Sequence, residues 1–140
     1  MTMTEDEIRD IVTRFTDLAW NGGDLDLIDE LFSVDYVGHD APRPDPVKGP
    51  EGMKDFLRMY RGAFSDAHIA LDDMIIAGDK VVTRWTGTGT HDGNLMGMAP
   101  TGKAVSFVGI RIFRVDGGQI VEGWVVWDTF GLMRQLGAGS

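Results

Sequence analysis

Residues 103–130 read KAVSFVGIRIFRVDGGQIVEGWVVWDTF and carry the clearest structural signal in the chain. Two apolar runs, rich in β-branched and aromatic residues, flank an Asp-Gly-Gly turn, which predicts two long strands joined as a hairpin. A two-residue loop at Gly117-Gly118 places Asp116 opposite Gln119. The stretch therefore predicts an antiparallel pair of strands in a defined register.

This register assigns the side chains of the hairpin to two faces. Arg111 lies opposite Trp124, and a longer turn would shift the pairs but keep Trp124 and Asp128 on one side. One face carries Phe107, Arg111, Phe113, Glu122, Trp124, Val126 and Asp128, and the other carries Val108, Ile110, Ile112, Val121, Val125 and Trp127. Both faces are largely apolar, whereas helices can cover only one. We therefore expect a homo-oligomer, most simply a homodimer, that uses the second face.

Turn residues divide the rest of the chain into elements. A Thr4-x-x-Glu7 capping box opens a helix that Asn21-Gly22-Gly23 ends. Asp24 is expected to cap a second short helix, an extended piece covers 36–39, and prolines make 41–46 a loop. A third helix begins at Pro50, with Met53, Phe56, Leu57, Tyr60 and Phe64 at core spacing. Strands are expected over 67–76, 80–90, 103–115 and 119–130, followed by a helical tail over 131–136.

The order of these elements, helices first and then an antiparallel meander, predicts an α+β fold. The 140 residues, 43% of them hydrophobic, suffice for one buried core and thus for a single domain over 1–140. A formal net charge of -9 argues against binding to nucleic acid or to an anionic membrane. The N-terminus is acidic and lacks an apolar run, so we expect a cytoplasmic protein without nucleic-acid or membrane partners.

Several classes of chemistry are disfavoured by the residues present. The chain has no cysteine, which excludes disulfides, thiolate metal sites and cysteine nucleophiles. Its three histidines are dispersed and show no metal-binding spacing. No serine stands in a nucleophile elbow, and no glycine-rich stretch completes a nucleotide fingerprint. We therefore expect neither a metal nor a nucleotide cofactor.

Several stretches resemble one known family. They are Gly89-Thr90-His91-Asp92-Gly93, the turn from Gly97 to Lys103, the hairpin from Ile112 to Ile120, the run from Trp124 through Asp128 to Gly137, and the Tyr36-x-x-His39 step. Together they are similar to the SnoaL-like polyketide cyclases of the nuclear-transport-factor-2-like superfamily. The similarity covers nearly the whole chain.

The resemblance implies a fold and a chemistry. The fold is a cone of N-terminal helices on a curved antiparallel or mixed sheet that encloses an apolar cavity. Characterised members close a ring of an aromatic polyketide ester by intramolecular aldol condensation, without a metal or an organic cofactor. Their acid/base aspartate near the end of the last strand matches Asp128. They pair it with a histidine on the preceding strand, where this chain offers Arg111 and Arg114 instead.

Three residues are the catalytic candidates. Asp128 follows a buried strand and either acts as the acid/base group or caps the helical tail. Arg111 either polarises a carbonyl or forms an ion pair with Glu122. His39 either serves as a second acid/base group or bonds to local backbone.

A second set is expected to contact a hydrophobic small-molecule substrate. It consists of Trp124, Phe107, Val126, Phe113, Tyr60, Met98 and His91. Met98 lies in a glycine-rich loop that reads either as a mobile lid or as ordinary packing. The leading interpretation is a cofactor-independent cyclase acting on a hydrophobic polyketide ester. Its alternatives are an isomerase or epoxide hydrolase of the same superfamily, or a protein that binds a hydrophobic metabolite without turnover.

Overall fold

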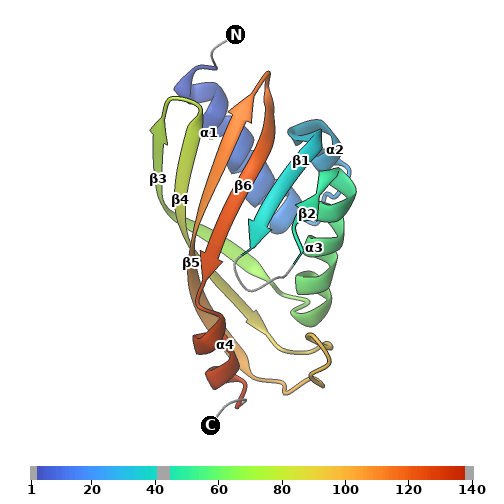
Figure 1. Cartoon of the computed structure of the whole chain (residues 1–140). Coiled ribbons are helices and arrows are strands. Elements are labelled where there is room, and N and C mark those ends of the chain that lie inside the picture. The colour runs from blue at the N-terminus through green and yellow to red at the C-terminus, as the bar shows by residue number, and fades with distance from the viewer. Residues whose placement is uncertain (1–2, 41–44, 138–140) are drawn as a thin grey trace.

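Six strands form one curved sheet in the order β2-β1-β6-β5-β4-β3 (Figure 1). The computed structural model describes residues 3–40 and 45–137, so most of the proline-rich loop expected at 41–46 lies outside the described residues. The strands are β1 (Phe32–Asp40), β2 (Val47–Lys48), β3 (His68–Ala77), β4 (Lys80–Thr90), β5 (Ala104–Asp116) and β6 (Gln119–Trp127). The helices are α1 (Glu5–Arg14), the π-helix η1 (Phe15–Trp20), α2 (Leu27–Leu31), α3 (Gly49–Ala63) and α4 (Thr129–Gln135).

The sheet is mixed. Strands β3 to β6 pair antiparallel in chain order, as the turn residues predict. β1 is longer than the extended piece expected at 36–39 and pairs in parallel with β6. Strand β1, which comes between α2 and α3 in the chain, thus adds to the last strand of the meander. The prediction of an α+β fold is confirmed.

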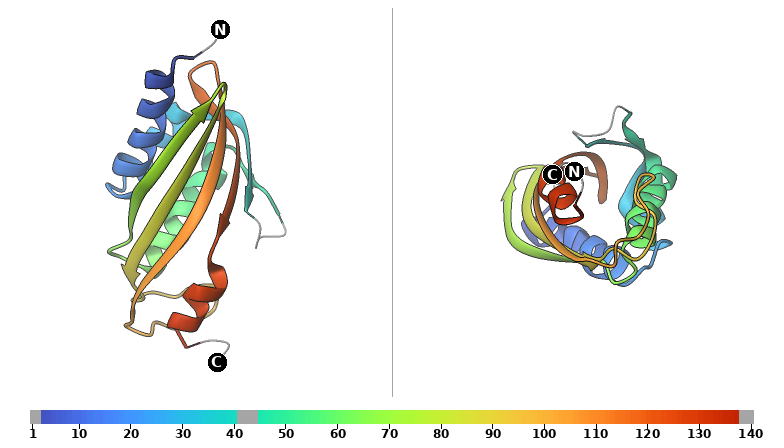
Figure 2. Two further views of the ribbon diagram at one scale, coloured as in Figure 1. Left: turned by 90° about the vertical axis from the view of Figure 1, so that its left-hand side faces the viewer. Right: turned by 90° about the horizontal axis from the view of Figure 1, so that it is seen from below.

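Helices cover the concave side of the sheet. The capping box of α1 forms as predicted: Glu7 N donates to Thr4 Oγ1 and Thr4 N donates to Glu7 Oε1, both at 3.1 Å. Edge-to-face ring pairs join the helices to the strands, with centroids 5.7 Å apart for both Phe15–Phe113 and Tyr60–Trp127. Figure 2 shows the sheet curling around this helical layer. No helix in the described part of the chain has the length and apolar character needed to cross a bilayer.

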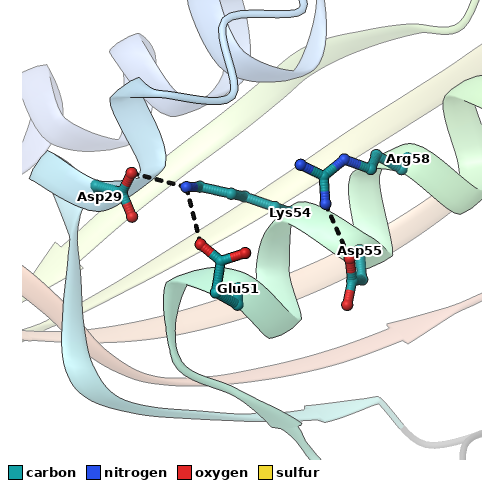
Figure 3. A network of polar contacts seen from close by, with 5 residues as sticks. All are labelled: Asp29, Glu51, Lys54, Asp55 and Arg58. Carbon is teal, nitrogen blue, oxygen red and sulfur yellow. Dashed lines mark hydrogen bonds and ion pairs between the residues drawn. The ribbon is translucent and has the colours of Figure 1, made fainter.

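A buried lysine holds α2 against α3. Lys54 Nζ donates to Asp29 of α2 at 2.7 Å and to Glu51 of α3 at 3.0 Å, while its side chain is 10% exposed (Figure 3). These hydrogen bonds, the one to Asp29 first and then the one to Glu51, raise the pKa of Lys54. The α2 helix begins at Leu27, and Asp26 rather than Asp24 occupies its N-cap position, so the cap predicted for Asp24 is wrong.

One extra residue in β6 changes the predicted faces of the last hairpin. Asp116 pairs with Gln119 as expected, but the register shifts between Val115 and Arg114, so Val121 has no partner in β5. Such a bulge moves every later side chain of β6 to the other face. Arg111 therefore lies opposite Val125 rather than Trp124.

Because of the bulge, the predicted faces are wrong for the side chains of β6 and right for those of β5. Trp127 is turned inward and is 8% exposed, whereas Val126 is turned outward and is 65% exposed. Phe107, Arg111 and Phe113 of β5 stay on the concave side, as predicted. The predicted inward placement of Trp124 and Val126 on β6 is wrong for this reason.

Candidate active site

An apolar cavity lies between the sheet and the helices. It holds about 670 Å³ of empty space, its opening to solvent included. Aromatic rings from three parts of the fold line it: Phe15 and Trp20 of η1, Phe56 and Tyr60 of α3, and Trp85, Phe107, Phe113 and Trp127 of the strands. Such a wall suits a flat, hydrophobic ligand.

The glycine at position 109 makes room for two of these rings. A Cβ atom at Gly109 would overlap the six-membered ring of Trp85 and would lie 2.8 Å from Trp127 Cβ. Only glycine therefore lets both indoles lie across β5. The predicted faces do not place Trp127 in the cavity wall, because they assign it to the outer face. Trp85 is not among the predicted substrate contacts.

Arg111 introduces charge into this wall. Among the described residues that line the cavity, it is the one lysine, arginine, aspartate or glutamate. Its Cζ atom lies 5.3 Å from the centroid of the Phe113 ring and 5.9 Å from that of Phe15. Burial lowers the pKa of Arg111, and nearby Tyr36 and Asp40 raise it in turn. A cation in such a site can polarise a carbonyl or hold an enolate oxygen.

A smaller hollow of about 250 Å³ lies beside the cavity. Arg111 and Phe56 line both spaces. The remaining lining residues come from β1, β2, α3 and β6: Tyr36, Gly38, His39, Asp40, Val47, Met53, Gly123, Trp124 and Val125. Arg111 thus faces an aromatic space on one side and a more polar one on the other.

Sequence reasoning did not identify Asp40 as a site residue. Tyr36, Gly38 and Asp40 alternate along β1 and are all buried, with Asp40 5% exposed. Side chains alternate between the two faces of a strand, so a strand that continues from buried Tyr36 turns Asp40 inward and His39 outward. This alternation was the available signal for Asp40. The signal was missed because the extended piece was expected to end at residue 39.

Tyr36 is a buried phenol on the same strand as this carboxylate. Its hydroxyl lies so close to Gly38 and Gly123 that a Cβ at either position would come within 2.6 Å of the oxygen. Burial raises the pKa of Tyr36 to about 12, and nearby Arg111 opposes that rise. Tyr36 therefore keeps its proton in the neutral pH range.

Asp128 does not face the cavity. It is exposed, and its Oδ1 accepts a hydrogen bond of 2.8 Å from Gly131 N at the start of α4. Strand β6 ends at Trp127, so Asp128 occupies the N-cap position instead of a strand position. The expectation that its carboxylate points into the cavity is wrong, and the capping alternative describes the structure.

His39 and Trp124 lie together at the rim of the smaller hollow. Their rings stack with centroids 5.7 Å apart, and His39 Nε2 lies 3.1 Å from Glu122 Oε2. Arg114 Nη2 lies 3.3 Å from the other oxygen of Glu122. The hydrogen bond from His39, followed by that from Arg114, lowers the pKa of Glu122. Glu122 therefore pairs with His39 and Arg114, and the alternative in which Arg111 forms an ion pair with Glu122 is wrong.

The other expected substrate contacts divide into two groups. Tyr60, Phe107 and Phe113 line the cavity. His91 is fully buried, and its Nδ1 accepts a hydrogen bond of 3.2 Å from Thr101 N, which fixes the loop between β4 and β5. Met98 forms an isolated bridge with Leu95 in that loop. Neither His91 nor Met98 lines the cavity, and Val126 lies on the outer face.

The chain is similar in sequence and in structure to known proteins. A family model described as SnoaL-like polyketide cyclase matches residues 10–136. The aklanonic acid methyl ester cyclase DnrD of Streptomyces peucetius is 32% identical over 130 residues, covering 91% of this chain and 89% of that protein. The nogalonic acid methyl ester cyclase of Streptomyces nogalater is 29% identical over 121 residues, which cover 85% of this chain and 90% of that protein. TsrD from Streptomyces laurentii has a similar structure, with a TM-score of 0.87 and 31% sequence identity. The match covers 97% of this chain and 98% of TsrD.

Proposed function

Because the chain belongs to the SnoaL-like polyketide cyclase family, we propose that it closes a ring of a hydrophobic polyketide ester by acid/base catalysis inside the cavity. The observation that carries the proposal is the guanidinium of Arg111 within an aromatic wall. The flat rings of a polyketide match that wall, and its ketone and ester oxygens match the cation. Relatives that are named as cyclases of polyketide methyl esters support the same substrate class.

The proposed reaction is an intramolecular aldol addition. A base removes the proton from a carbon between two carbonyls, and negative charge develops on an enolate oxygen. Arg111 is positioned to stabilise that charge, and an electrostatic contact of this kind gains strength where water is excluded. The cavity holds the enolate carbon against the ketone carbon that it attacks. Only protons move between protein and substrate, so the scheme draws on no cofactor.

Turnover of the two named esters tests the proposal. The purified protein is incubated with aklanonic acid methyl ester or nogalonic acid methyl ester, and a product of unchanged mass is followed by liquid chromatography and mass spectrometry. Arg111→Met is expected to lower kcat/KM on the order of 100-fold or more, because it removes one stabilising charge from the transition state. Arg114→Met is the matched control, since Arg114 lies on the outer face beside Glu122.

Two results would count against ring closure. One is binding of both esters by the wild-type protein without any isomeric product, which would instead support a protein that holds a hydrophobic metabolite. The other is full turnover by Arg111→Met.

We also infer that two copies of the chain pair through the outer face of the sheet. Ile110 of β5 and Val126 of β6 are cross-strand partners, and both are exposed on the side opposite the helices. Val108 extends this apolar surface along β5. An exposed apolar patch on a sheet face is the kind of surface that a twofold homodimer buries, which favours a second copy of the chain as its partner.

A further inference from the structure

A carboxylate lies in the same row of the sheet as Arg111. In β1, Asp40 is the register partner of Val125, and Val125 is in turn the partner of Arg111 in β5. Adjacent strands are about 4.8 Å apart, so the backbones of Asp40 and Arg111 are separated by roughly 10 Å with Val125 between them. All three residues line the smaller hollow. A dicarbonyl group placed over Val125 would have Asp40 on one side and Arg111 on the other.

We propose that Asp40 is the base that removes the proton from the substrate carbon, while Arg111 holds the oxygen on which the enolate charge develops. This assignment rests on the ring closure proposed above and supplies the group that moves the proton. Asp40 is 5% exposed. Its proton therefore passes to and from the substrate rather than to bulk water.

The other titratable groups of the smaller hollow fit this role less well. Among the described residues that line either hollow, Asp40 is the one carboxylate. Tyr36 retains its proton, since burial raises its pKa to about 12. His39 is exposed, and its Nε2 is engaged by Glu122 on the outer face.

Two groups of the larger cavity are also excluded as the base. His68 of β3 pairs with Thr88 of β4, whereas Arg111 of β5 pairs with Thr83 of β4. The two partners on β4 are five residues apart. At about 3.4 Å per residue, this separation is roughly 17 Å, too far for one substrate carbon to meet both groups. Tyr60 is a phenol and, like Tyr36, is ordinarily protonated at neutral pH.

The proton and electron movements balance without another reactant. The Asp40 carboxylate forms an O–H bond as the substrate C–H bond breaks, and the electron pair of that bond moves to the enolate oxygen beside Arg111. The enolate carbon then forms a C–C bond to the ketone carbon, whose π pair becomes an alkoxide. The alkoxide takes the proton back from Asp40, so the product is an isomer of the substrate and the carboxylate is restored.

The first test compares two isosteric changes on the same strand. Asp40→Asn is expected to lower kcat for aklanonic acid methyl ester by 10²- to 10⁴-fold, the usual contribution of a positioned acid/base group. Asp35→Asn, at an exposed position of β1, is expected to retain kcat within about threefold. Full turnover by Asp40→Asn overturns the proposal, as does a comparable loss that is confined to Asp128→Asn.

A second test measures binding and needs no turnover. The probes are 2-hydroxy-1,4-naphthoquinone, whose anion mimics an enolate flanked by carbonyls, and neutral 2-methoxy-1,4-naphthoquinone. Removing the negative charge of Asp40 relieves its repulsion of the anion, so Asp40→Asn is expected to bind the hydroxy probe about tenfold more tightly. Its affinity for the methoxy probe is expected to stay within about twofold. Equal affinity of wild type and Asp40→Asn for the anion contradicts the assignment.

The two tests separate this inference from the ring-closure proposal. Turnover by the wild type together with unchanged kcat and anion affinity in Asp40→Asn overturns the base alone. Tighter anion binding by Asp40→Asn, with no ester turned over by the wild type, overturns the ring closure and supports the placement of Asp40. Circular dichroism establishes that each variant folds. If Asp40→Asn does not fold, Asp40→Glu replaces it: reduced kcat with unchanged anion affinity supports the proposal, and unchanged kcat overturns it.

Discussion

Single residues in this protein gain their character from how closely the backbone is packed around them. The Tyr36 hydroxyl fits over Gly38 and Gly123 because neither has a Cβ atom in its way. That packing removes the phenol from water, and burial then raises its pKa to about 12. Arg111 is similarly enclosed, with two aromatic rings within 6 Å of its guanidinium carbon. The polar chemistry of the site is thus set by side chains that the fold withdraws from solvent.

The raised pKa of Tyr36 predicts a loss of stability at alkaline pH. Above pH 10 the unfolded chain releases this proton, while the folded chain holds it until about pH 12. The unfolded state then binds fewer protons than the folded state, so the free energy of unfolding falls as pH rises from 10 toward 12. The loss from this one group reaches at most about 3 kcal/mol. Urea unfolding at pH 8 and at pH 11.5 measures it.

Tyr36→Phe is the control for that measurement. It removes the titrating group and keeps the ring, so its stability should fall less steeply over the same pH range than that of the wild type. Parallel curves for the two proteins would show that Tyr36 does not carry the alkaline loss.

At the scale of elements, the end of β6 illustrates how one side chain divides a strand from a helix. Asp128 caps α4 through Gly131 N. Asp128→Ala should lower the free energy of unfolding by about 1 kcal/mol, while Asp128→Asn should lose much less, because asparagine caps about as well as aspartate. Urea denaturation of both variants measures the difference. Equal losses from the two substitutions would mean that capping is not what the aspartate contributes.

Local signals predicted the elements well and their pairing less well. The Thr4 capping box, Pro50 and the Gly117-Gly118 turn act within a few residues, so the sequence around each one suffices to place an element boundary. The bulge at Val121 has no turn or cap signal of this kind beside it, because it depends on how β6 pairs with β5. Its effect on the predicted site was large, because one extra residue inverted every side chain from Glu122 to Trp127.

The same limit applies to the members of the site. Arg111 could be predicted from its place on β5, whereas Asp40 becomes a candidate only once β1 is known to lie beside β6. That parallel pairing joins segments that are far apart in the chain, and no local pattern encodes it. Asp128, in contrast, is a catalytic candidate through the resemblance and through the apolar strand before it, and its position after the last strand residue makes it a cap.

For the whole molecule, the two faces of the sheet have different roles. The concave face encloses the cavity, and the outer face exposes Ile110 and Val126 side by side. Val126→Lys is expected to convert a dimer to a monomer, because it places a charge at the centre of the proposed apolar contact. Light scattering after size-exclusion chromatography measures the mass, with Phe130→Lys as a control beyond the end of β6. A wild-type protein that is monomeric at all concentrations would refute the dimer.

The parallel pairing of β1 with β6 also has a consequence for how the protein reaches its active form. The meander from β3 to β6 joins neighbouring segments through short turns, whereas β1 must wait for the end of the chain before it finds its partner. Pairing over such a sequence separation carries a large loop-closure entropy and is slow for that reason. Asp40 and Arg111 come together only in this late step. During synthesis on the ribosome, we therefore expect β3 to β5 to pair before β1 joins β6 and completes the proposed site.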